Sequence, residues 1–217
     1  MSMRRRTAIL ISGRGSNMRW LIEAARAPDF PAEIALVASN RPEAPGLAVA
    51  KQAGIATAAV DHKIYAGREE FEASLQKLLD VHRIELICLA GFMRMFTAGF
   101  VERWGERMIN VHPALLPAYR GLHTHERALS DGVKIHGCTV HFVVPGMDEG
   151  PIIAQAAVPV LDEDNAETLA ARVLEQEHLL YPMALGIVAS GKYKIDGNSV
   201  HSKPTTGNKS LVNPSYD

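Results

Sequence analysis

Short apolar segments of strand length alternate along this chain with longer segments of helical period. The strand-length segments lie at 7–12, 33–39, 57–60, 85–91 and 108–113, and segments of helical character lie at 18–27, 46–53 and 71–82. Because these strands are almost wholly apolar, both faces of their sheet must be covered. The pattern therefore predicts an α/β fold in a single domain, with an open, mostly parallel sheet and helices on both faces.

The last third of the chain departs from this alternation. Two strand-length segments, 135–145 and 152–160, have no helical segment between them, so we expect an antiparallel edge. A helix is predicted over 166–190, with a bend near Pro182. From His201 onward, Ser, Pro, Thr, Gly and Asn dominate and the periodicity is lost. We expect one domain over 1–200 and a loose tail over 201–217.

Charge, cysteine content and hydropathy exclude several classes of protein. The chain has 23 Lys and Arg against 24 Asp and Glu. This balance argues against a strongly basic nucleic-acid-binding protein, because binding to phosphates needs an excess of positive charge. Cys88 and Cys138 lie in apolar stretches and are expected to be reduced, buried thiols. No run of 18 apolar residues is present, and the apolar run after the N-terminal arginines is too short for a signal peptide. We expect a cytoplasmic protein with no membrane partner.

The first strand-to-helix turn reads ISGRGSN, at 11–17. Glycine lets a ligand approach the backbone closely, and a helix N-terminus offers free N–H groups to an anion. Ser16 and Asn17 add side-chain donors or cap the helix. A dinucleotide site would need a third glycine where Met18 stands, and an acidic residue after the second strand. The turn therefore favours a monophosphate and argues against an NAD-linked oxidoreductase; a tight turn without a ligand remains open.

A second motif combines three kinds of polar side chain. Asn110 and His112 are two residues apart on a predicted strand, so their side chains point to the same side, near the strand end where α/β sheets bind ligands. Asp148 and Glu149 lie in a turn before the last strand, and either could supply a carboxylate. An amide and a protonated imidazole can hold an oxyanion, and a carboxylate can keep the imidazole protonated. The set suits acyl or formyl transfer, while a core histidine and a simple turn aspartate remain the alternatives.

These motifs, in this order and spacing, resemble the folate-dependent phosphoribosylglycinamide formyltransferases over residues 8–194. The segments that carry the resemblance are ISGRGSNM, LAGFMRMF, INVHPALLPAYRGLHTHERAL, HGCTVHFV, MDEGPIIAQ and ARVLEQEHLLYP. The resemblance implies a Rossmann-like formyltransferase fold with a phosphate-binding N-terminal half and a folate-binding, catalytic C-terminal half. It implies formyl transfer from 10-formyltetrahydrofolate to the amine of 5'-phosphoribosylglycinamide in purine synthesis. Small molecules would be the only partners of a monomer or homodimer, with no metal and no nucleic acid.

The resemblance also implies roles for individual residues. Asn110, His112 and Asp148 would be catalytic. Gly15, Ser16 and Asn17 would hold the substrate phosphate, and Glu177 would lie near the glycinamide ribotide. The folate would lie against Arg68, Met93, Arg94, Met95, Phe96, Val101, Val144, Pro145, Gly146 and Met147. The two arginines suit its acidic end because a guanidinium binds carboxylates bidentately.

Two positions depart from the family pattern. Glu149 stands where other members have Gly or Ala, and we expect it either to raise pKa values around Asp148 or to face solvent. Arg14 lies between the two glycines of the turn and is expected to attract the phosphate.

Besides the NAD-linked oxidoreductase, four other functions are alternatives to this one. Methionyl-tRNA formyltransferase and formyltetrahydrofolate hydrolase normally carry a further C-terminal or N-terminal domain that is not seen here, so we expect neither activity. A non-catalytic binding module stays open. So does a metal hydrolase built on His123 and His125, although two histidines with few nearby carboxylates are a weak metal signal.

Overall fold

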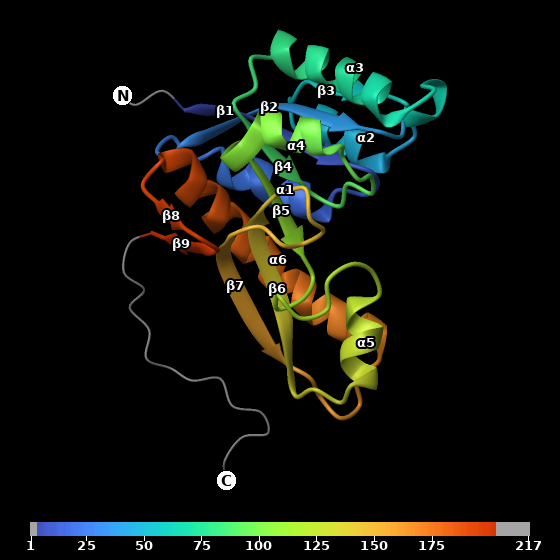
Figure 1. Cartoon of the computed structure of the whole chain (residues 1–217), viewed down its shortest axis with the longest axis vertical. Coiled ribbons are helices and arrows are strands. Elements are labelled where there is room, and N and C mark those ends of the chain that lie inside the picture. Colours follow the sequence, from blue (N-terminus) through green and yellow to red (C-terminus); the bar gives the residue numbers. More distant parts are fainter. Residues whose placement is uncertain (1–3, 203–217) are drawn as a thin grey trace.

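The computed structural model describes residues 4–202, and within them nine strands form one sheet in the order β3-β2-β1-β4-β5-β6-β7-β9-β8 (Figure 1). The strands are β1 (Arg5–Ile11), β2 (Ala32–Ser39), β3 (Thr57–Ala59), β4 (Leu86–Leu89), β5 (Met108–His112), β6 (Ile135–Phe142), β7 (Ile152–Pro159), β8 (Lys194–Asp196) and β9 (Ser199–His201). Five of the eight described pairings are parallel; β5–β6, β6–β7 and β8–β9 are antiparallel. The mostly parallel sheet is confirmed, and its antiparallel part begins one strand earlier than expected.

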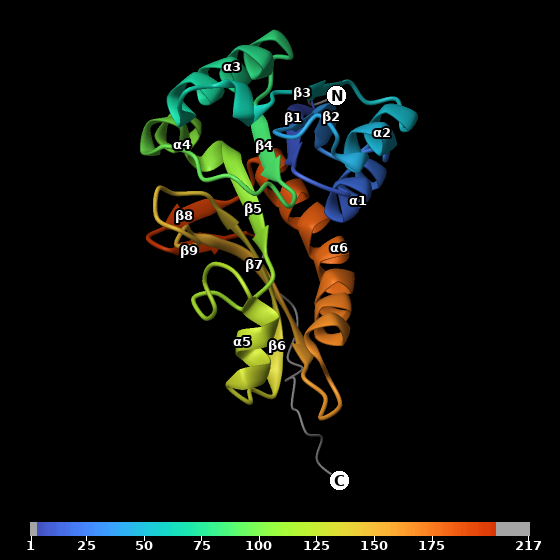
Figure 2. The same cartoon turned by 90° about the vertical axis from the view of Figure 1, so that its right-hand side faces the viewer.

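Helices cover both faces of the sheet, as predicted. The α-helices are α1 (Ser16–Ala24), α2 (Pro45–Gln52), α3 (Arg68–Val81), α4 (Ala98–Trp104), α5 (Thr124–Ser130) and α6 (Ala166–Ser190), and two 3₁₀ turns are η1 (His62–Ile64) and η2 (Gly105–Arg107). Figure 2 shows α1, α2 and α6 on one side of the sheet and α3 and α4 on the other. No α-helix among residues 4–202 is long and apolar enough to span a membrane.

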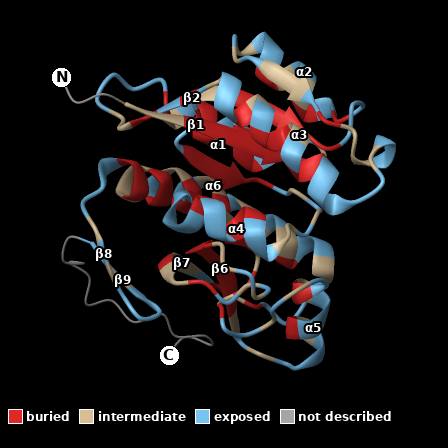
Figure 3. Cartoon of the chain, turned by 45° about the horizontal axis from the view of Figure 1, so that its top comes forward, coloured by how far each residue is buried: buried red, intermediate tan, exposed pale blue. Residues whose placement is uncertain are grey.

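Alternate residues of the central strands enter two separate hydrophobic cores. In β5, Ile109 and Val111 join the core that contains residues of α1 and α6, whereas Met108 joins the core beneath α3 and α4. Successive side chains of a strand point to opposite faces. Asn110 and His112 therefore lie on the same side as Met108. Figure 3 shows buried residues gathered in the central strands and exposed residues on the outer sides of α3 and α4.

The long helix α6 fixes the two halves of the sheet to each other. It begins with a capping box between Asn165 and Thr168 and continues through Pro182 as one helix. Tyr181 is fully buried, and its hydroxyl lies 3.0 and 3.1 Å from the carbonyl oxygens of Leu89 in β4 and Ile109 in β5. A single side chain thus joins α6 to two neighbouring strands.

Several predicted bounds were wrong. The first helix begins at Ser16 rather than residue 18 because Gly15 adopts a left-handed conformation (φ 72°) directly before it, and it ends at Ala24 rather than residue 27. The helices α4 and α5 were not predicted. His201 belongs to strand β9, so the predicted tail is wrong at its first residue, and residues 203–217 of that tail lie outside the described residues.

Both cysteines are free and buried, as predicted. Burial raises the pKa of the Cys88 thiol and of the Cys138 thiol to about 12, so each remains protonated at neutral pH.

Candidate active site

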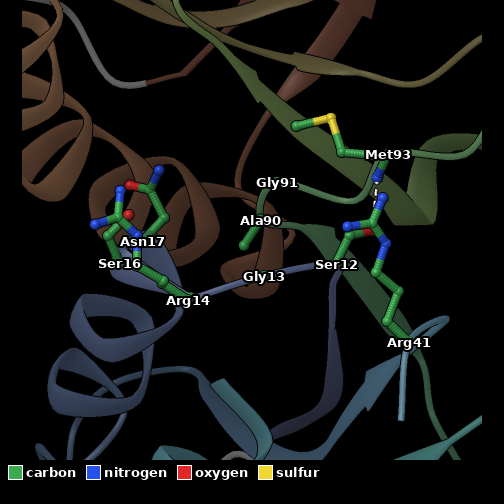
Figure 4. A pocket seen from close by; sticks show the side chains of 10 residues that line it. Ser12, Gly13, Arg14, Ser16, Asn17, Arg41, Ala90, Gly91 and Met93 are labelled. Atoms are coloured by element: carbon green, nitrogen blue, oxygen red, sulfur yellow. Dashed lines mark hydrogen bonds between the residues drawn. The ribbon is translucent and has the colours of Figure 1, made fainter. Parts of the chain in front are cut away.

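A cavity of about 300 Å³ opens where the strand order reverses between β1 and β4. It is lined by Ser12, Gly13, Arg14, Gly15, Ser16, Asn17, Arg41, Ala90, Gly91 and Met93 (Figure 4). Most of these residues directly follow the carboxyl ends of β1, β2 and β4. Open α/β sheets bind ligands at such a position, and the volume suits a small molecule.

The glycine turn brings backbone N–H groups to this cavity. Gly15 starts α1 with positive φ, so Ser16 and Asn17 occupy the first turn of the helix, where N–H groups have no partner within the helix. We expected the Ser16 and Asn17 side chains to act as donors to a ligand or to cap the helix. Neither side chain caps the helix. Helix α2 packs tightly on the same turn, because Gly46 donates its N–H to the carbonyl of Gly13 at 3.1 Å and has no room for a Cβ.

The structure brings Asn17 and Glu177 together across 160 residues of sequence. The Asn17 Nδ2 donates to Glu177 Oε2 at 2.6 Å. Glu177 is buried on α6, and burial raises the pKa of its carboxyl above the ordinary 4.5 while the Asn17 hydrogen bond lowers it. The Asn17 Oδ1 is also buried and has no hydrogen-bond partner within the described chain. This pair therefore offers both an amide oxygen and a carboxylate to a ligand at the start of α1.

Sequence reasoning missed two residues of the cavity. Arg41, beyond the end of β2, adds a second arginine to the lining, on the opposite side of the cavity from Arg14 (Figure 4). The buried Ser12 donates to Asn40 Oδ1 at 2.5 Å and accepts the Met93 N–H at 2.8 Å, the bond drawn in Figure 4. Arg41 could have been found from the sequence, because it lies just after the second strand, where α/β sheets bind ligands. We had noted only that no acidic residue stands at that position.

His112 and Asp148 meet on the opposite face of the sheet from α6. His112 is the last residue of β5, and its Nδ1 lies 3.4 Å from Asp148 Oδ2. Its Nε2 lies 2.9 Å from the carbonyl oxygen of Tyr119, and Asp148 Oδ2 also accepts the Gly121 N–H at 2.9 Å. Both imidazole nitrogens therefore face oxygen atoms that can accept a hydrogen.

Asn110 is held by a histidine that sequence reasoning did not single out. Asn110 and His141 are directly opposite each other in the β5–β6 ladder, and Asn110 Nδ2 lies 3.3 Å from His141 Nε2. Burial lowers the pKa of His141, and its Nδ1 lies 2.8 Å from the carbonyl oxygen of Phe142. A carbonyl can only accept, so the Nδ1 carries the hydrogen and the Nε2 lone pair accepts from Asn110.

The loops around His112 contain two residues with positive φ and one close ion pair. Tyr119 and Asp148 both have positive φ, 55° and 53°, which is costly for residues other than glycine. Arg120 Nη1 lies 2.5 Å from Glu149 Oε1. We expected Glu149 either to raise pKa values around Asp148 or to face solvent. Its side chain is half-exposed, which is closer to the second expectation, but it also forms an ion pair with Arg120 that the sequence did not predict.

The residues assigned to the folate divide into two groups. Met93, Met95 and Met147 are exposed, and residues 144–147 belong to the loop between β6 and β7. In contrast, Val101 is only 4% exposed in the core beneath α3 and α4, and Phe96 stacks on Phe100 at 4.5 Å between ring centroids. The exposed Arg68 begins α3, while Arg94 is half-buried in the loop after β4.

The two histidines considered for a metal site make different direct contacts. The exposed His123 lies 3.5 Å from Glu126, while the His125 ring packs edge-on against His136. Burial lowers the pKa of His136 to about 4. Among residues 4–202, no cluster of three or more His, Cys, Asp or Glu is arranged to hold a metal ion.

The chain matches known proteins over most of its length. The family described as formyl transferase matches residues 5–185. Phosphoribosylglycinamide formyltransferase of Escherichia coli (strain K12) is 41% identical over 191 residues, which cover 88% of this chain and 90% of that protein. The crystal structure of phosphoribosylglycinamide formyltransferase from Brucella melitensis has 56% identity and a TM-score of 0.83, over 87% of this chain and 97% of that one.

A third relative is a much longer protein. The human trifunctional purine biosynthetic protein adenosine-3 is 46% identical over 193 residues, which cover 89% of this chain but only 19% of that protein. The chain thus spans about a fifth of the length of this relative.

Proposed function

The chain belongs to the formyl transferase family, and on that premise we propose that it transfers a formyl group from 10-formyltetrahydrofolate to the amine of 5'-phosphoribosylglycinamide. The products are formylglycinamide ribonucleotide and tetrahydrofolate, in purine synthesis. The observation that carries the proposal is the cluster at the end of β5, where Asp148 lies 3.4 Å from His112 and 3.7 Å from His141, the residue that accepts the Asn110 amide.

The substrate phosphate binds at the N-terminus of α1. Gly15, Ser16 and Asn17 supply backbone N–H groups there, and the helix dipole favours an anion. Arg14 and Arg41, which both line the cavity, add two positive charges. The Glu177 carboxylate, bonded to Asn17, lies within reach of the hydroxyl and amine groups of the ribotide.

The amine nitrogen attacks the formyl carbon directly, without a covalent enzyme intermediate. An α-amine has a pKa near 8, so a useful fraction is neutral at pH 7. As the new C–N bond forms, the carbonyl electron pair moves to the oxygen, and collapse of this intermediate breaks the bond to N10 of the folate. The amine loses a proton and the folate nitrogen gains one.

Asn110 and His112 hold the oxyanion of that intermediate. One hydrogen of the Asn110 amide goes to His141, and the other is the one we assign to the oxyanion. The His112 Nε2 donates to the Tyr119 carbonyl, and in the reaction the oxyanion replaces that carbonyl as acceptor. A charged acceptor makes the stronger hydrogen bond. Asp148 orients the imidazole through Nδ1 and helps to carry the amine proton away through a water molecule.

The folate lies along the exposed methionine surface. Met93, Met95 and Met147 offer soft, polarisable groups to a flat pterin. Arg68 and Arg94 suit the carboxylates at its acidic end. The deep burial of Val101 makes it a supporting residue beneath this surface rather than a contact.

We also propose that the enzyme acts in the cytoplasm as a monomer or homodimer and that its partners are the two small-molecule substrates. The formyltransferase domain includes strand β9 and so extends to His201.

A paired turnover assay tests the proposed function. Purified protein is mixed with a 10-formyl folate, with and without the ribonucleotide, and release of the deformylated folate is followed spectroscopically. Release that depends on the ribonucleotide is the expected result. Equal release in both mixtures would indicate a hydrolase, and binding of folate without any release would indicate a non-catalytic binding module.

A further inference from the structure

Two loops meet over His112 and supply its partners. The 113–123 loop, between β5 and α5, contributes the Tyr119 carbonyl to Nε2 of the imidazole. The 143–151 loop, between β6 and β7, contributes the Asp148 carboxylate to Nδ1 at 3.4 Å. The geometry around the imidazole therefore depends on how closely the two loops approach each other.

The 113–123 loop is held firmly near Arg120. Arg127 of α5 donates from Nη1 to the carbonyl oxygen of Arg120 at 2.7 Å, and its guanidinium lies 5.4 Å from the centroid of the Tyr119 ring. At the other end of the loop, Thr139 of β6 donates to the carbonyl of Ala114 at 2.7 Å. The backbone that presents the Arg120 side chain is thus fixed from α5.

The 143–151 loop is held at its base. Phe142 donates its N–H to the carbonyl of Pro151 at 3.0 Å, and Val143 donates to the carbonyl of Met108 at 2.9 Å. Near its tip, Asp148 has a positive φ of 53°, a conformation that costs energy and needs support from contacts. His112 and His141 of the sheet lie 3.4 and 3.7 Å from the Asp148 carboxylate, and the other loop supplies further contacts.

Two adjacent residues on each loop form those contacts. Gly121 donates its N–H to Asp148 Oδ2 at 2.9 Å, and next to it Arg120 Nη1 lies 2.5 Å from Glu149 Oε1. From these contacts we propose that the Arg120–Glu149 ion pair holds the two loops together and thereby positions Asp148 against His112. This inference rests on the proposed function, because its consequence for turnover depends on the role of His112.

The ion pair also neutralises the negative charge of Glu149, which would otherwise repel the neighbouring Asp148 carboxylate. Glu149 puts a second carboxylate directly beside Asp148, and the guanidinium of Arg120 neutralises it at close range. Arg120 and Glu149 are 42% and 50% exposed, so water and salt screen the attraction. Exposed ion pairs have modest effects, and we expect changes of about 2- to 5-fold rather than a loss of activity.

The test combines amide hydrogen exchange at Gly121 with steady-state kinetics. In Arg120→Gln and Glu149→Gln, the Gly121 N–H should exchange about 2- to 5-fold faster and kcat should fall by a similar factor, with the KM for the folate unchanged. In the double variant Arg120→Gln with Glu149→Gln, the Gly121 exchange rate and kcat should change no more than in either single variant. The charge-swapped variant, Arg120→Glu with Glu149→Arg, should restore both readouts. Arg26→Gln, which removes an exposed ion pair with Glu23 on α1, is the matched control and should change neither.

Two results would overturn the inference. Unchanged Gly121 exchange in both single variants would show that the ion pair does not hold the loops. A raised KM for the folate in Arg120→Gln, with unchanged exchange, would make Arg120 a ligand contact instead. Because exchange is measured without substrates, it decides on the ion pair even if the wild-type protein shows no turnover, which would contradict the proposed function alone.

Discussion

At the scale of single residues, the tautomer of His141 determines what Asn110 can do. The Nδ1 hydrogen of His141 is committed to the Phe142 carbonyl, and its Nε2 fixes one amide hydrogen of Asn110. Without this acceptor, the Asn110 amide is free to rotate. His141 is therefore a positioning residue for the amide that we assign to the oxyanion.

We expect His141→Leu to lower kcat by about 10- to 100-fold, because small errors in the placement of a reacting group are costly. The KM for the ribonucleotide should change little, since the glycine turn is untouched. His141→Gln should recover part of the loss because the glutamine oxygen can accept from Asn110. Wild-type kcat in His141→Leu would refute the positioning role.

The buried carboxyl of Glu177 gives a stability prediction with a defined sign. Its pKa is raised by burial above 4.5, so the unfolded chain ionises this group more readily than the folded chain does. The resulting destabilisation is absent at low pH and develops as the pH rises through the raised pKa. Glu177→Gln should therefore raise the Tm at neutral pH more than at pH 4.5, while raising the KM for the ribonucleotide.

Thermal unfolding at both pH values measures this effect. The control is Glu175→Gln, which removes an exposed carboxyl from the same helix. An equal change of Tm at both pH values in Glu177→Gln would contradict the assigned cause.

The sequence predicted some of these residues because their signal is local. Asn110 and His112 share a strand face by spacing alone, and the glycine turn precedes a helix. His141 and Arg41 could not be found in this way. Identifying His141 requires the register of β5 against β6, and identifying Arg41 requires the loop after β2 to lie beside β1.

At the scale of elements, α3 supports the loop that carries the methionine surface. The buried Glu72 of α3 accepts the Thr97 N–H at 2.6 Å and its hydroxyl at 2.5 Å, where Thr97 caps α4. These bonds fix the end of the loop that contains Met93 and Met95.

Glu72→Ala should raise the KM for the folate and lower the free energy of unfolding by about 1–3 kcal/mol, since the part-buried Thr97 N–H and hydroxyl lose a charged acceptor. Folate titration and urea unfolding measure the two effects. Glu69→Ala, an exposed change in the first turn of the same helix, is the control. An unchanged KM would show that Met93 and Met95 do not depend on this support.

Periodicity located the long elements and missed the short ones for a physical reason. A helical period is recognised over a window of about 11–18 residues, whereas α4 and α5 have seven residues each. The strands β8 and β9 have three residues each and alternate around partly buried Ile195 and Val200. Strand β9 pairs with β7 and β8 pairs with β9, and local sequence does not specify these partners.

At the scale of the whole molecule, Tyr181 joins the covering helix to the centre of the sheet. Its hydroxyl lies 3.0 Å from the carbonyl oxygen of Leu89, the last residue of β4, and 3.1 Å from that of Ile109 near the start of β5. Tyr181→Phe should lower the free energy of unfolding by about 1–3 kcal/mol, because a buried hydrogen bond is lost. Urea unfolding measures this loss, and Met183→Leu on the exposed side of α6 should cause little change. A wild-type unfolding midpoint in Tyr181→Phe would contradict this role.

The central claim is that Asn110, His112 and Asp148 together carry out formyl transfer. The most direct measurement is kcat for ribonucleotide-dependent release of the folate product in Asn110→Ala, His112→Ala and Asp148→Ala, each verified as folded by circular dichroism. Loss of one oxyanion donor typically costs about 10²- to 10³-fold, and we predict at least that loss in each variant. Turnover near the wild-type rate in any two of the folded variants would contradict the claim.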